Sequence, residues 1–444
     1  MEKPFILIQG PVATRSGYGS HARDLCIELL KSDKYDIKIV SRRWGNTPMN
    51  ALRNDVEDHK LIIDNLQVGN NLPKQPDLHI DITVPNEFQA IGKKNMGITA
   101  GLEATVIPKH WVDGLNRMDK IVVPSKFVKD VCASTTFDEK QGDKVVAQHK
   151  CNKPIDVLFE GYDEAVYGMT NEYSKALVDE MKQIDETFCF LFVGHWLQGN
   201  MGEDRKDVGM MIKAFLEAFK GKKKKPALIL KTSSATFSVM DRMEILDKIE
   251  FVKRDVGGDI PNIYLLHGDL EDYEMNELYN HPKVKAHISF THGEGFGRPL
   301  LEASLSGKPI LFSKWSGHID FLPATLSTAL DGTMVGVPKA SFPKDMFVDG
   351  MGWFAVNYGK AINLMKDVYD SYNKYKPIFQ HLGKSNTKKF TRSKMGEKFV
   401  QIVDEMIAGT PKQVNIKLPK LKKIDGGQTG AIKPPTGLPK LKKA

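Results

Sequence analysis

The sequence predicts an α/β protein with two mostly parallel β-sheets. Short apolar runs alternate with helix-like stretches from residue 5 onward, and the same alternation restarts near residue 187. Strands separated by helices are typical of parallel sheets. At 444 residues, with 41% hydrophobic and 27% charged residues, the chain is too long for one ordinary core and too apolar to be broadly disordered. Two domains are therefore expected.

The first sheet is predicted from five apolar runs. Its expected strands are Phe5–Gln9, Tyr35–Val40, Leu78–Val84, Asn95–Thr99 and Lys120–Val123. After the first strand comes a loop, residues 10–20, and then a helix for which Ser20 is the expected cap. That helix is predicted because Ala22, Leu25, Cys26, Leu29 and Leu30 recur at helical spacing.

The second sheet follows an acidic stretch, residues 171–186. Its expected strands are Thr187–Gly194, Ala227–Lys231, Asn262–Leu266, Ala286–Phe290 and Pro309–Phe312. Residues 353–379 and 393–408 are read as helices. Because ligands of such sheets bind beyond the carboxyl ends of the strands, the crevice between two sheets is the expected site.

The formal charge of +8 is not spread along the chain. Residues 412–444 contain nine lysines and one acid, Asp425, so this segment alone carries 9 − 1 = +8 and residues 1–411 are formally neutral. A surface-wide nucleic-acid footprint is unsupported, whereas a basic arm fits. The segment repeats Leu-Pro-Lys-Leu-Lys-Lys at 418–423 and 438–443, so we expect a flexible tail that contacts DNA, an acidic membrane surface or a partner protein.

The cellular location is predicted from two features. No apolar run approaches the roughly 20 residues that span a bilayer, and the chain runs from Met1 directly into a strand-like segment. The four cysteines, Cys26, Cys132, Cys151 and Cys189, are scattered and are read as free thiols. A cytoplasmic protein is expected.

The strongest chemical signal is the segment Thr291-His-Gly-Glu-Gly-Phe-Gly-Arg-Pro-Leu-Leu-Glu302. Gly295 and Gly297 allow close approach of a ligand, and Pro299 is favoured in the first turn of a helix. Free amides and the dipole of that helix suit a diphosphate. Glu294 and Glu302 add two carboxylates that can accept hydrogen bonds from the hydroxyl groups of a bound polyol.

This segment resembles the retaining glycosyltransferases of the GT-B fold, specifically glycosyltransferase family 4, whose hallmark is two glutamates separated by seven residues around Gly-Phe-Gly. The resemblance continues into Gly307-Lys-Pro309 and Ser316-Gly317. It implies two Rossmann-like domains facing each other across a cleft. It also implies that Glu294 meets the donor sugar, that Glu302 holds the ribose, and that the amides of Gly295, Phe296 and Gly297 meet the phosphates.

Family members also use an arginine and a lysine to neutralise the departing diphosphate. The lysine matches Lys206, in Asp204-Arg205-Lys206, while His195 stands where the family has arginine. Lys231, at the end of a predicted strand, is a candidate for the second cation, and Arg205 is another.

Two residues of the first half complete the expected site. Gly19, in Ser16-Gly-Tyr-Gly-Ser20, occupies the place of the glycine-rich loop that the family has beside donor and acceptor. Glu103 follows a predicted strand at a position where many relatives carry a histidine facing the reacting sugar.

The resemblance implies residues 1–180 as an acceptor domain, 181–390 as a nucleotide-sugar domain, 391–411 as a helix packing back on the first domain, and 412–444 as the tail. The implied activity moves a sugar from a nucleotide-sugar, preferably a UDP-sugar, to a hydroxyl group with retention and without a metal or other cofactor. The acceptor is either a hydroxylated DNA base or a glycan. A sugar-nucleotide epimerase of the same architecture and a non-catalytic binding module are the alternatives.

Overall fold

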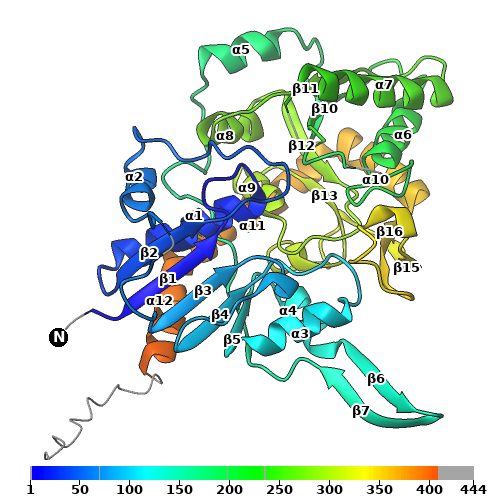
Figure 1. The fold of residues 1–444 in the computed structure, drawn as a ribbon. Helices are drawn as coiled ribbons and strands as arrows, with labels where there is room; N and C mark the ends of the chain where they lie inside the picture. The colour runs from blue at the N-terminus through cyan, green and yellow to red at the C-terminus, as the bar shows by residue number, and fades with distance from the viewer. Residues whose placement is uncertain (1–2, 70, 198, 235–236, 409–444) are drawn as a thin grey trace, which may run out of the picture. The chain divides into compact units, whose positions relative to one another are not determined.

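The computed structural model describes residues 3–69, 71–197, 199–234 and 237–408. These residues belong to one compact unit, residues 1–410, that contains two six-stranded sheets (Figure 1). We call the sheet around β1 and its helices the first domain, and the sheet around β9 and its helices the second domain. The expected tail, residues 412–444, lies outside the described residues.

The first sheet is parallel throughout and contains all five expected strands plus one more. In spatial order its strands are β2 (Asp36–Ser41), β1 (Phe5–Gly10), β3 (Leu78–Ile82), β4 (Lys94–Ile98), β5 (Lys120–Val123) and β8 (Ile155–Val157). The helices of this half are α1 (Gly17–Lys31), α2 (Glu57–Asp64), α3 (Lys109–Arg117) and α4 (Lys126–Ser134), with a short 3₁₀ turn η1 (Pro85–Glu87).

The second sheet is also parallel throughout, so the predicted fold class is confirmed. In spatial order its strands are β11 (Ile263–Leu266), β10 (Ala227–Lys231), β9 (Cys189–Val193), β12 (Val284–Ser289), β13 (Ile310–Ser313) and β14 (Ala329–Leu330). Its helices are α5 (Lys175–Lys182), α6 (Val208–Phe219), α7 (Val239–Val256), α8 (Asp272–Asn280), α9 (Arg298–Leu305), α10 (Tyr358–Asp370) and α11 (Tyr372–Lys389), with 3₁₀ turns η2 (Gly317–Asp320) and η3 (Lys339–Ser341).

The first helix begins earlier than predicted. Ser16, not Ser20, is the N-cap of α1, and its hydroxyl accepts a hydrogen bond of 3.0 Å from the amide of Gly19. Ser16 has the extended backbone that a cap requires, whereas Ser20 lies inside the helix. Both serines have capping side chains, and the sequence alone did not distinguish them.

The single helix predicted over residues 353–379 is also wrong. Residues 352–356 form the strand β16 (Gly352–Val356), which pairs antiparallel with β15 (Gly332–Gly336). Asn357 then caps α10 by accepting from the amide of Lys360, and a second helix, α11, follows from Tyr372. The apolar residues of the strand were read as a helical face because strand and helix periodicities agree over such a short stretch.

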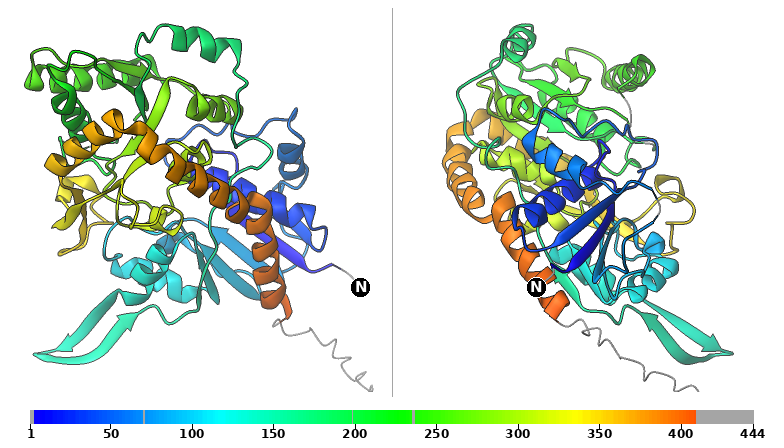
Figure 2. Two further views of the ribbon diagram at one scale, coloured as in Figure 1. Left: turned by 180° about the vertical axis from the view of Figure 1, so that it is seen from behind. Right: turned by 60° about the vertical axis from the view of Figure 1, so that its left-hand side comes forward.

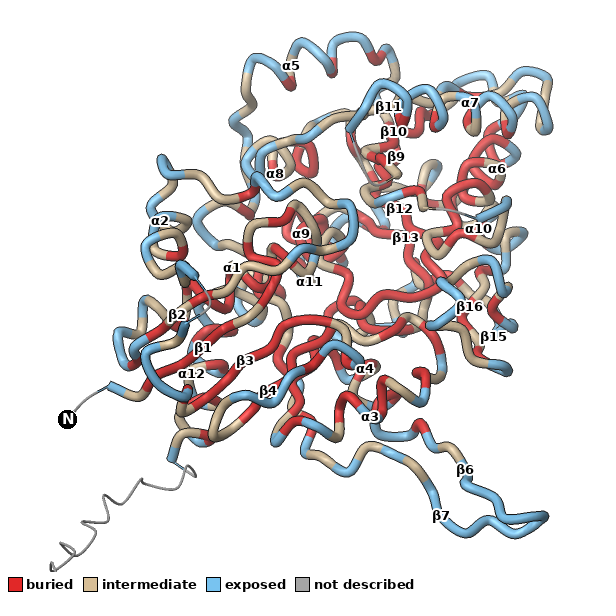
Figure 3. The backbone as a smooth tube through the Cα atoms, in the orientation of Figure 1, coloured by how far each residue is buried: buried red, intermediate tan, exposed pale blue. Residues whose placement is uncertain are grey.

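A hairpin that was not predicted projects from the first domain. It consists of β6 (Thr136–Gln141) and β7 (Lys144–Lys150), and most of its residues are exposed (Figure 3). Its sequence, which is rich in charged residues, lacks the alternating apolar pattern of a half-buried strand.

The last described helix returns to the first domain. Helix α12 (Arg392–Ala408) packs against α1, and its residues Met395, Phe399, Val403 and Met406 join the core formed by Ile6, Ile8 and Ile80. Figure 2 shows α11 and α12 leading from the second domain to the side of α1. Arg392 at its start forms ion pairs with Glu28 (3.3 Å), Asp58 (2.8 Å) and Asp163 (2.9 Å).

Two further properties concern location and redox state. Within the part of the chain that the structure describes, no helix has both the length and the apolar character needed to cross a bilayer. All four cysteines are free thiols, and three of them are buried.

Candidate active site

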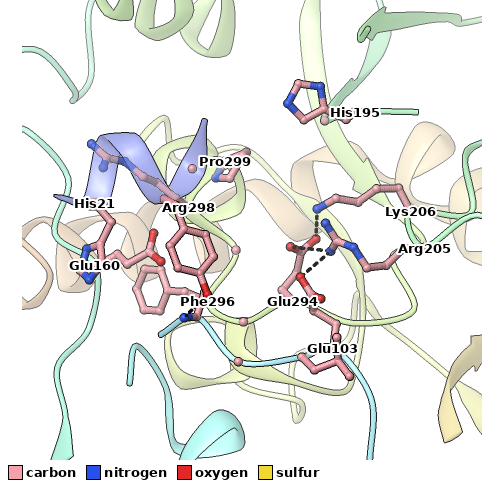
Figure 4. A pocket seen from close by; sticks show the side chains of 18 of the residues that line it. His21, Glu103, Glu160, His195, Arg205, Lys206, Glu294, Phe296, Arg298 and Pro299 are labelled. Carbon is pink, nitrogen blue, oxygen red and sulfur yellow. Dashed lines mark hydrogen bonds and ion pairs between the residues drawn. The ribbon is translucent and has the colours of Figure 1, made fainter. Parts of the chain in front are cut away.

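A cavity of about 560 Å³ lies at the carboxyl ends of strands from both sheets. The first domain contributes residues that follow β1, β2, β3 and β4, and the second domain contributes residues that follow β9, β10 and β12. This is the location expected for a ligand of paired parallel sheets. Figure 4 shows 18 of the residues that line it and labels ten of them.

The glycine-rich segment turns directly from β12 into α9. Gly297 is the N-cap of α9 in a left-handed conformation (φ 95°), and Pro299 occupies the first turn. A Cβ atom on Gly295 would lie 2.4 Å from the carbonyl oxygen of Ala100 in the first domain. The left-handed backbone therefore favours glycine at position 297, and the close approach of the two domains requires glycine at position 295.

Two cationic side chains contact Glu294. Its carboxylate forms ion pairs with Lys206, in very close contact, and with Arg205 Nη1 at 3.6 Å. The same Arg205 nitrogen pairs with Glu103 at 3.1 Å and donates to the carbonyl of Gly293. Burial alone would raise the pKa of Glu294, but Lys206 and Arg205 outweigh it and lower that pKa to about 2. Glu294 is therefore a carboxylate at neutral pH.

Three predicted residues, Glu294, Lys206 and Glu103, are thus brought together, and Arg205 is their common neighbour. The residue after Lys206, Asp207, is at the N-cap position of α6 in a left-handed conformation (φ 52°), and its Oδ2 accepts a hydrogen bond of 2.8 Å from Tyr358. Because Lys206 immediately precedes Asp207, the constrained backbone of Asp207 sets the position from which the Lys206 side chain extends.

Glu302 has a different environment. It does not appear among the cavity-lining residues, and its carboxylate is bound by Arg298 Nε at 3.0 Å and by the phenol of Tyr279 at 3.3 Å. Burial raises the pKa of Glu302 to about 7, although Arg298 opposes this shift. Arg298, the partner of Glu302, itself lines the cavity.

The two remaining candidate cations lie on the cavity wall. His195 shares a hydrogen bond of 3.2 Å with Ser233, and burial, reinforced by Lys206, lowers the pKa of the imidazole, so it is neutral near pH 7. Lys231 donates to the carbonyl of Gly268 at 2.7 Å, and its ammonium lies 5.5 Å from the ring centre of Phe237. His195 therefore does not supply the permanent charge of the arginine that it replaces.

Gly19 is placed outside the cavity wall. A Cβ on Gly19 would lie 2.3 Å from the carbonyl oxygen of Thr14, so this glycine serves the packing of the turn between β1 and α1. Its neighbours Gly17 and Tyr18 line the cavity instead. The phenol of Tyr18 shares a hydrogen bond of 3.0 Å with Thr99 and accepts one of 2.9 Å from the amide of Ala100.

Sequence reasoning missed one group of cavity residues, namely His21, Glu160 and Arg298. His21 comes from α1, Glu160 from the segment that follows β8, and Arg298 from the start of α9 (Figure 4). Burial raises the pKa of Glu160 to about 7 and lowers that of His21 to about 4. An arginine inside the glycine-rich motif was the only signal for this group, because the other two residues lie far away in the sequence.

Within the described residues, no group of three or more His, Cys, Asp or Glu side chains has the arrangement of a metal site. The cations of the cavity are side chains: Arg205, Lys206, Lys231 and Arg298. Together with the amides at the start of α9, they form an environment for a multiply charged anion.

Comparison with known proteins identifies the fold. No family model matches the chain, and no curated protein is similar in sequence. Among solved structures, HepE of Anabaena in complex with UDP-glucose superposes with a TM-score of 0.56 and 14% identity over 90% of this chain and 99% of that one. Sucrose-phosphate synthase of Thermosynechococcus elongatus superposes with a TM-score of 0.58 and 11% identity, over 92% of this chain and 100% of that one. A glycosyltransferase of Rickettsia africae superposes with a TM-score of 0.56 and 14% identity, over 92% of this chain and 100% of that one.

The chain thus has the GT-B fold, with two Rossmann-like domains that face each other across a cleft. The full length of these structures is matched, so the likeness covers both domains and not one alone.

Proposed function

We propose that this protein is a glycosyltransferase that moves a sugar from a nucleotide-sugar, preferably a UDP-sugar, to a hydroxyl group. The observation that supports this most is that Lys206 and Arg205, from the segment before α6, form ion pairs with Glu294, just before α9, inside a cleft of the GT-B type. Two of the similar structures contain UDP-glucose or a fluorinated analogue of it.

The reaction breaks the bond between the anomeric carbon and the diphosphate, and negative charge grows on the leaving group. An ammonium group has three donors, so Lys206 can keep its ion pair with Glu294 and still donate a hydrogen bond to a phosphate oxygen. The amides of Gly295, Phe296 and Gly297 and the N-terminus of α9 add to this stabilisation. Glu294, held as a carboxylate, accepts hydrogen bonds from the sugar hydroxyls.

Lys231 and Arg298 are proposed as the further cations for the diphosphate, in place of the neutral His195. Glu302 is proposed to act on the ribose after Arg298 has turned toward the donor, since Glu302 is now bound by Arg298, which lines the cavity. Retention of the anomeric configuration and independence of metal ions are proposed from the resemblance of the motif to family 4. The scattered free thiols support a cytoplasmic location for this activity.

The wall on the first-domain side favours a hydroxylated DNA base over a glycan as the acceptor. Most side chains of this wall are apolar or aromatic: Tyr18, Trp44, Ile82, Val84, Ile98, Leu102 and Trp111. Of the polar side chains on this side, Thr99 and Glu103 are already paired with Tyr18 and Arg205, while His21 and Glu160 also line the cavity. Glycan hydroxyl groups that lay against the apolar part of this wall would be buried without partners, at a cost of about 1–3 kcal/mol each.

A planar base suits the same wall. The indole N–H of Trp111 is buried and has no hydrogen-bond partner among the described residues, so it can donate to a ring nitrogen or carbonyl oxygen. A cavity of about 560 Å³ that also holds a donor has no room for a duplex, so the base would leave the helix before reaction. The lysine-rich tail, outside the described residues, would hold the DNA backbone nearby.

The deciding experiment incubates the protein with UDP-, GDP- and ADP-sugars, alone and with hydroxymethylated DNA or a panel of oligosaccharides. Nucleotide release and the mass of each acceptor are measured. The proposal expects a sugar-sized mass increase on DNA that Glu294→Gln abolishes and that Glu217→Gln, an exposed glutamate of α6, leaves unchanged.

Each other outcome has a defined meaning. A mass increase on an oligosaccharide would keep the transferase and replace the acceptor. Conversion of the donor without any acceptor would identify an epimerase, and no turnover of any donor would favour a binding module.

A further inference from the structure

A second cavity lies at the opposite end of the second sheet from the candidate active site. Its volume is about 340 Å³, at the lower end of the range for small-molecule pockets. It is lined by residues that precede β12 and β13, whereas the Glu294 segment follows the carboxyl end of β12. A ligand in this cavity would therefore be separate from the substrates of the proposed reaction.

Three lysines face this cavity without an acid to balance them. Lys285 lies on β12, Lys308 just before β13, and Lys376 on α11. The described residues that line the cavity include no Asp or Glu, and none of the three lysines forms an ion pair with any other part of the described chain. Three ammonium groups around one cavity repel one another, and an anion between them would remove that repulsion.

The lysine in the middle is held firmly in place. Lys308 Nζ donates to the carbonyl oxygens of Tyr279 at 2.8 Å and His281 at 2.7 Å, which leaves one of its three donors for a ligand. Burial, together with the charges of Lys285 and Lys376, lowers the pKa of Lys308. This shift is what an ammonium group shows when it lacks a counter-ion.

The third wall is a face of α11. Tyr372, Lys376 and Gln380 are spaced four residues apart and so lie on one side of the helix. Tyr372 is the first residue of α11, where the helix dipole also favours a negative charge. Asn171, which also lines the cavity, adds a side-chain amide that can donate to an anion.

We propose that this lysine pocket, formed by Lys285, Lys308 and Lys376, binds a phosphate group at a site distinct from the substrate cavity. The phosphate belongs either to a free small molecule or to the backbone of a nucleic acid, because both present the same tetrahedral anion.

The pocket is connected to the candidate active site through one residue. The backbone carbonyl of Tyr279 accepts from Lys308, and its phenol donates to Glu302. A phosphate that draws Lys308 away from this carbonyl changes the position of the residue that holds Glu302. Occupation of the lysine pocket is therefore expected to alter donor affinity at the other end of the sheet.

The test measures binding directly and needs no turnover. Isothermal titration of the wild-type protein with inorganic phosphate, and fluorescence anisotropy with a 12-nucleotide labelled DNA strand, are compared with the double variant Lys285→Gln/Lys376→Gln. Lys384→Gln is the matched control, since it removes an exposed lysine of the same helix α11 outside the pocket. Thermal unfolding confirms that each variant is folded.

At least one of the two probes is expected to bind at least tenfold more weakly to the double variant than to wild type, while Lys384→Gln binds both normally. Loss confined to phosphate identifies a small-molecule site, and loss confined to the DNA strand identifies a backbone contact. If the double variant and the control bind both probes equally, the proposal is wrong. A protein without transferase activity would leave this result intact, so the two proposals fail separately.

Discussion

Arg298 Nη1 lies 2.5 Å from Asp24 Oδ2, and this ion pair joins the two domains across the cleft. The same guanidinium holds Glu302 through its Nε, so one arginine satisfies a carboxylate from each domain. All three side chains are nearly buried, with exposed fractions of 16% for Arg298, 10% for Asp24 and 9% for Glu302.

Replacing Arg298 by leucine is expected to destabilise the protein by about 3–5 kcal/mol, because it removes the nearest cation from two buried carboxylates, Asp24 and Glu302. The free energy of unfolding in urea measures this. Arg254→Leu, at an exposed position of α7, is the control and should change it by less than about 0.5 kcal/mol. Equal effects of the two substitutions would contradict the role of Arg298 as the bridge between the domains.

The high pKa of Glu302 predicts a pH effect of defined sign. Its folded-state pKa of about 7 lies above the ordinary value of 4.5, so between these values the folded state binds more protons than the unfolded state. Stability from this group therefore falls as pH rises from about 4.5 to 7 and is level above that. The difference in unfolding free energy between wild type and Glu302→Gln should shift in favour of the variant over this window. A difference that is constant from pH 4.5 to 7 would show that burial does not raise this pKa.

Lys206→Gln is expected to lower kcat by about 10²- to 10³-fold, because it removes a charge that stabilises the leaving diphosphate. KM for the donor should change much less, since the amides of α9 remain. Initial rates of nucleotide release, measured over a range of donor concentrations, separate the two constants. Lys213→Gln, which removes an exposed ion pair with Asp255 on the surface of α6, is the control and should be fully active.

Gly295→Ala tests the close approach of the two domains. The new methyl group would lie 2.4 Å from the carbonyl oxygen of Ala100, so the glycine-rich segment or the domains must shift. We expect the affinity for UDP, the nucleotide part of the proposed donor, to fall at least tenfold, as measured by titration with UDP. Gly336→Ala, where a Cβ meets nothing within 4 Å, should bind UDP normally. A variant at Gly295 with unchanged affinity would mean that this contact does not shape the site.

The sheets could be predicted because buried parallel strands are continuous apolar runs, as in residues 189–193 and 227–231. The motif around Glu294 could be predicted because its glycines, proline and glutamates are close in sequence. Lys206 and Glu103 were found through the same resemblance. The contact of both with Arg205 and Glu294 depends on how two domains meet, which no local pattern encodes.

Other features could not be predicted because their local sequence patterns are ambiguous or absent. Gly19 was chosen for ligand contact, yet the structure gives its space to Thr14, because a glycine needed for packing has the same sequence signature as one needed for a ligand. His21 and Glu160 carry no motif, and they reach the cavity only after α1 and the segment behind β8 have come together. The first turn of α1 and the strand β16 were misassigned because neighbouring serines and short apolar runs are ambiguous.

The position of α12 has a consequence for biosynthesis. Its four apolar side chains complete the core beside β1 and α1, although about 230 residues are translated between the end of β8 and the start of α12. At 5–20 residues per second, the ribosome needs on the order of 10 to 50 seconds to supply the missing helix. During this time the nascent first domain exposes the apolar side of α1, so it depends on chaperones or on rapid completion of the chain. A truncated gene that ends before Arg392 should for this reason yield aggregates and not a smaller folded protein.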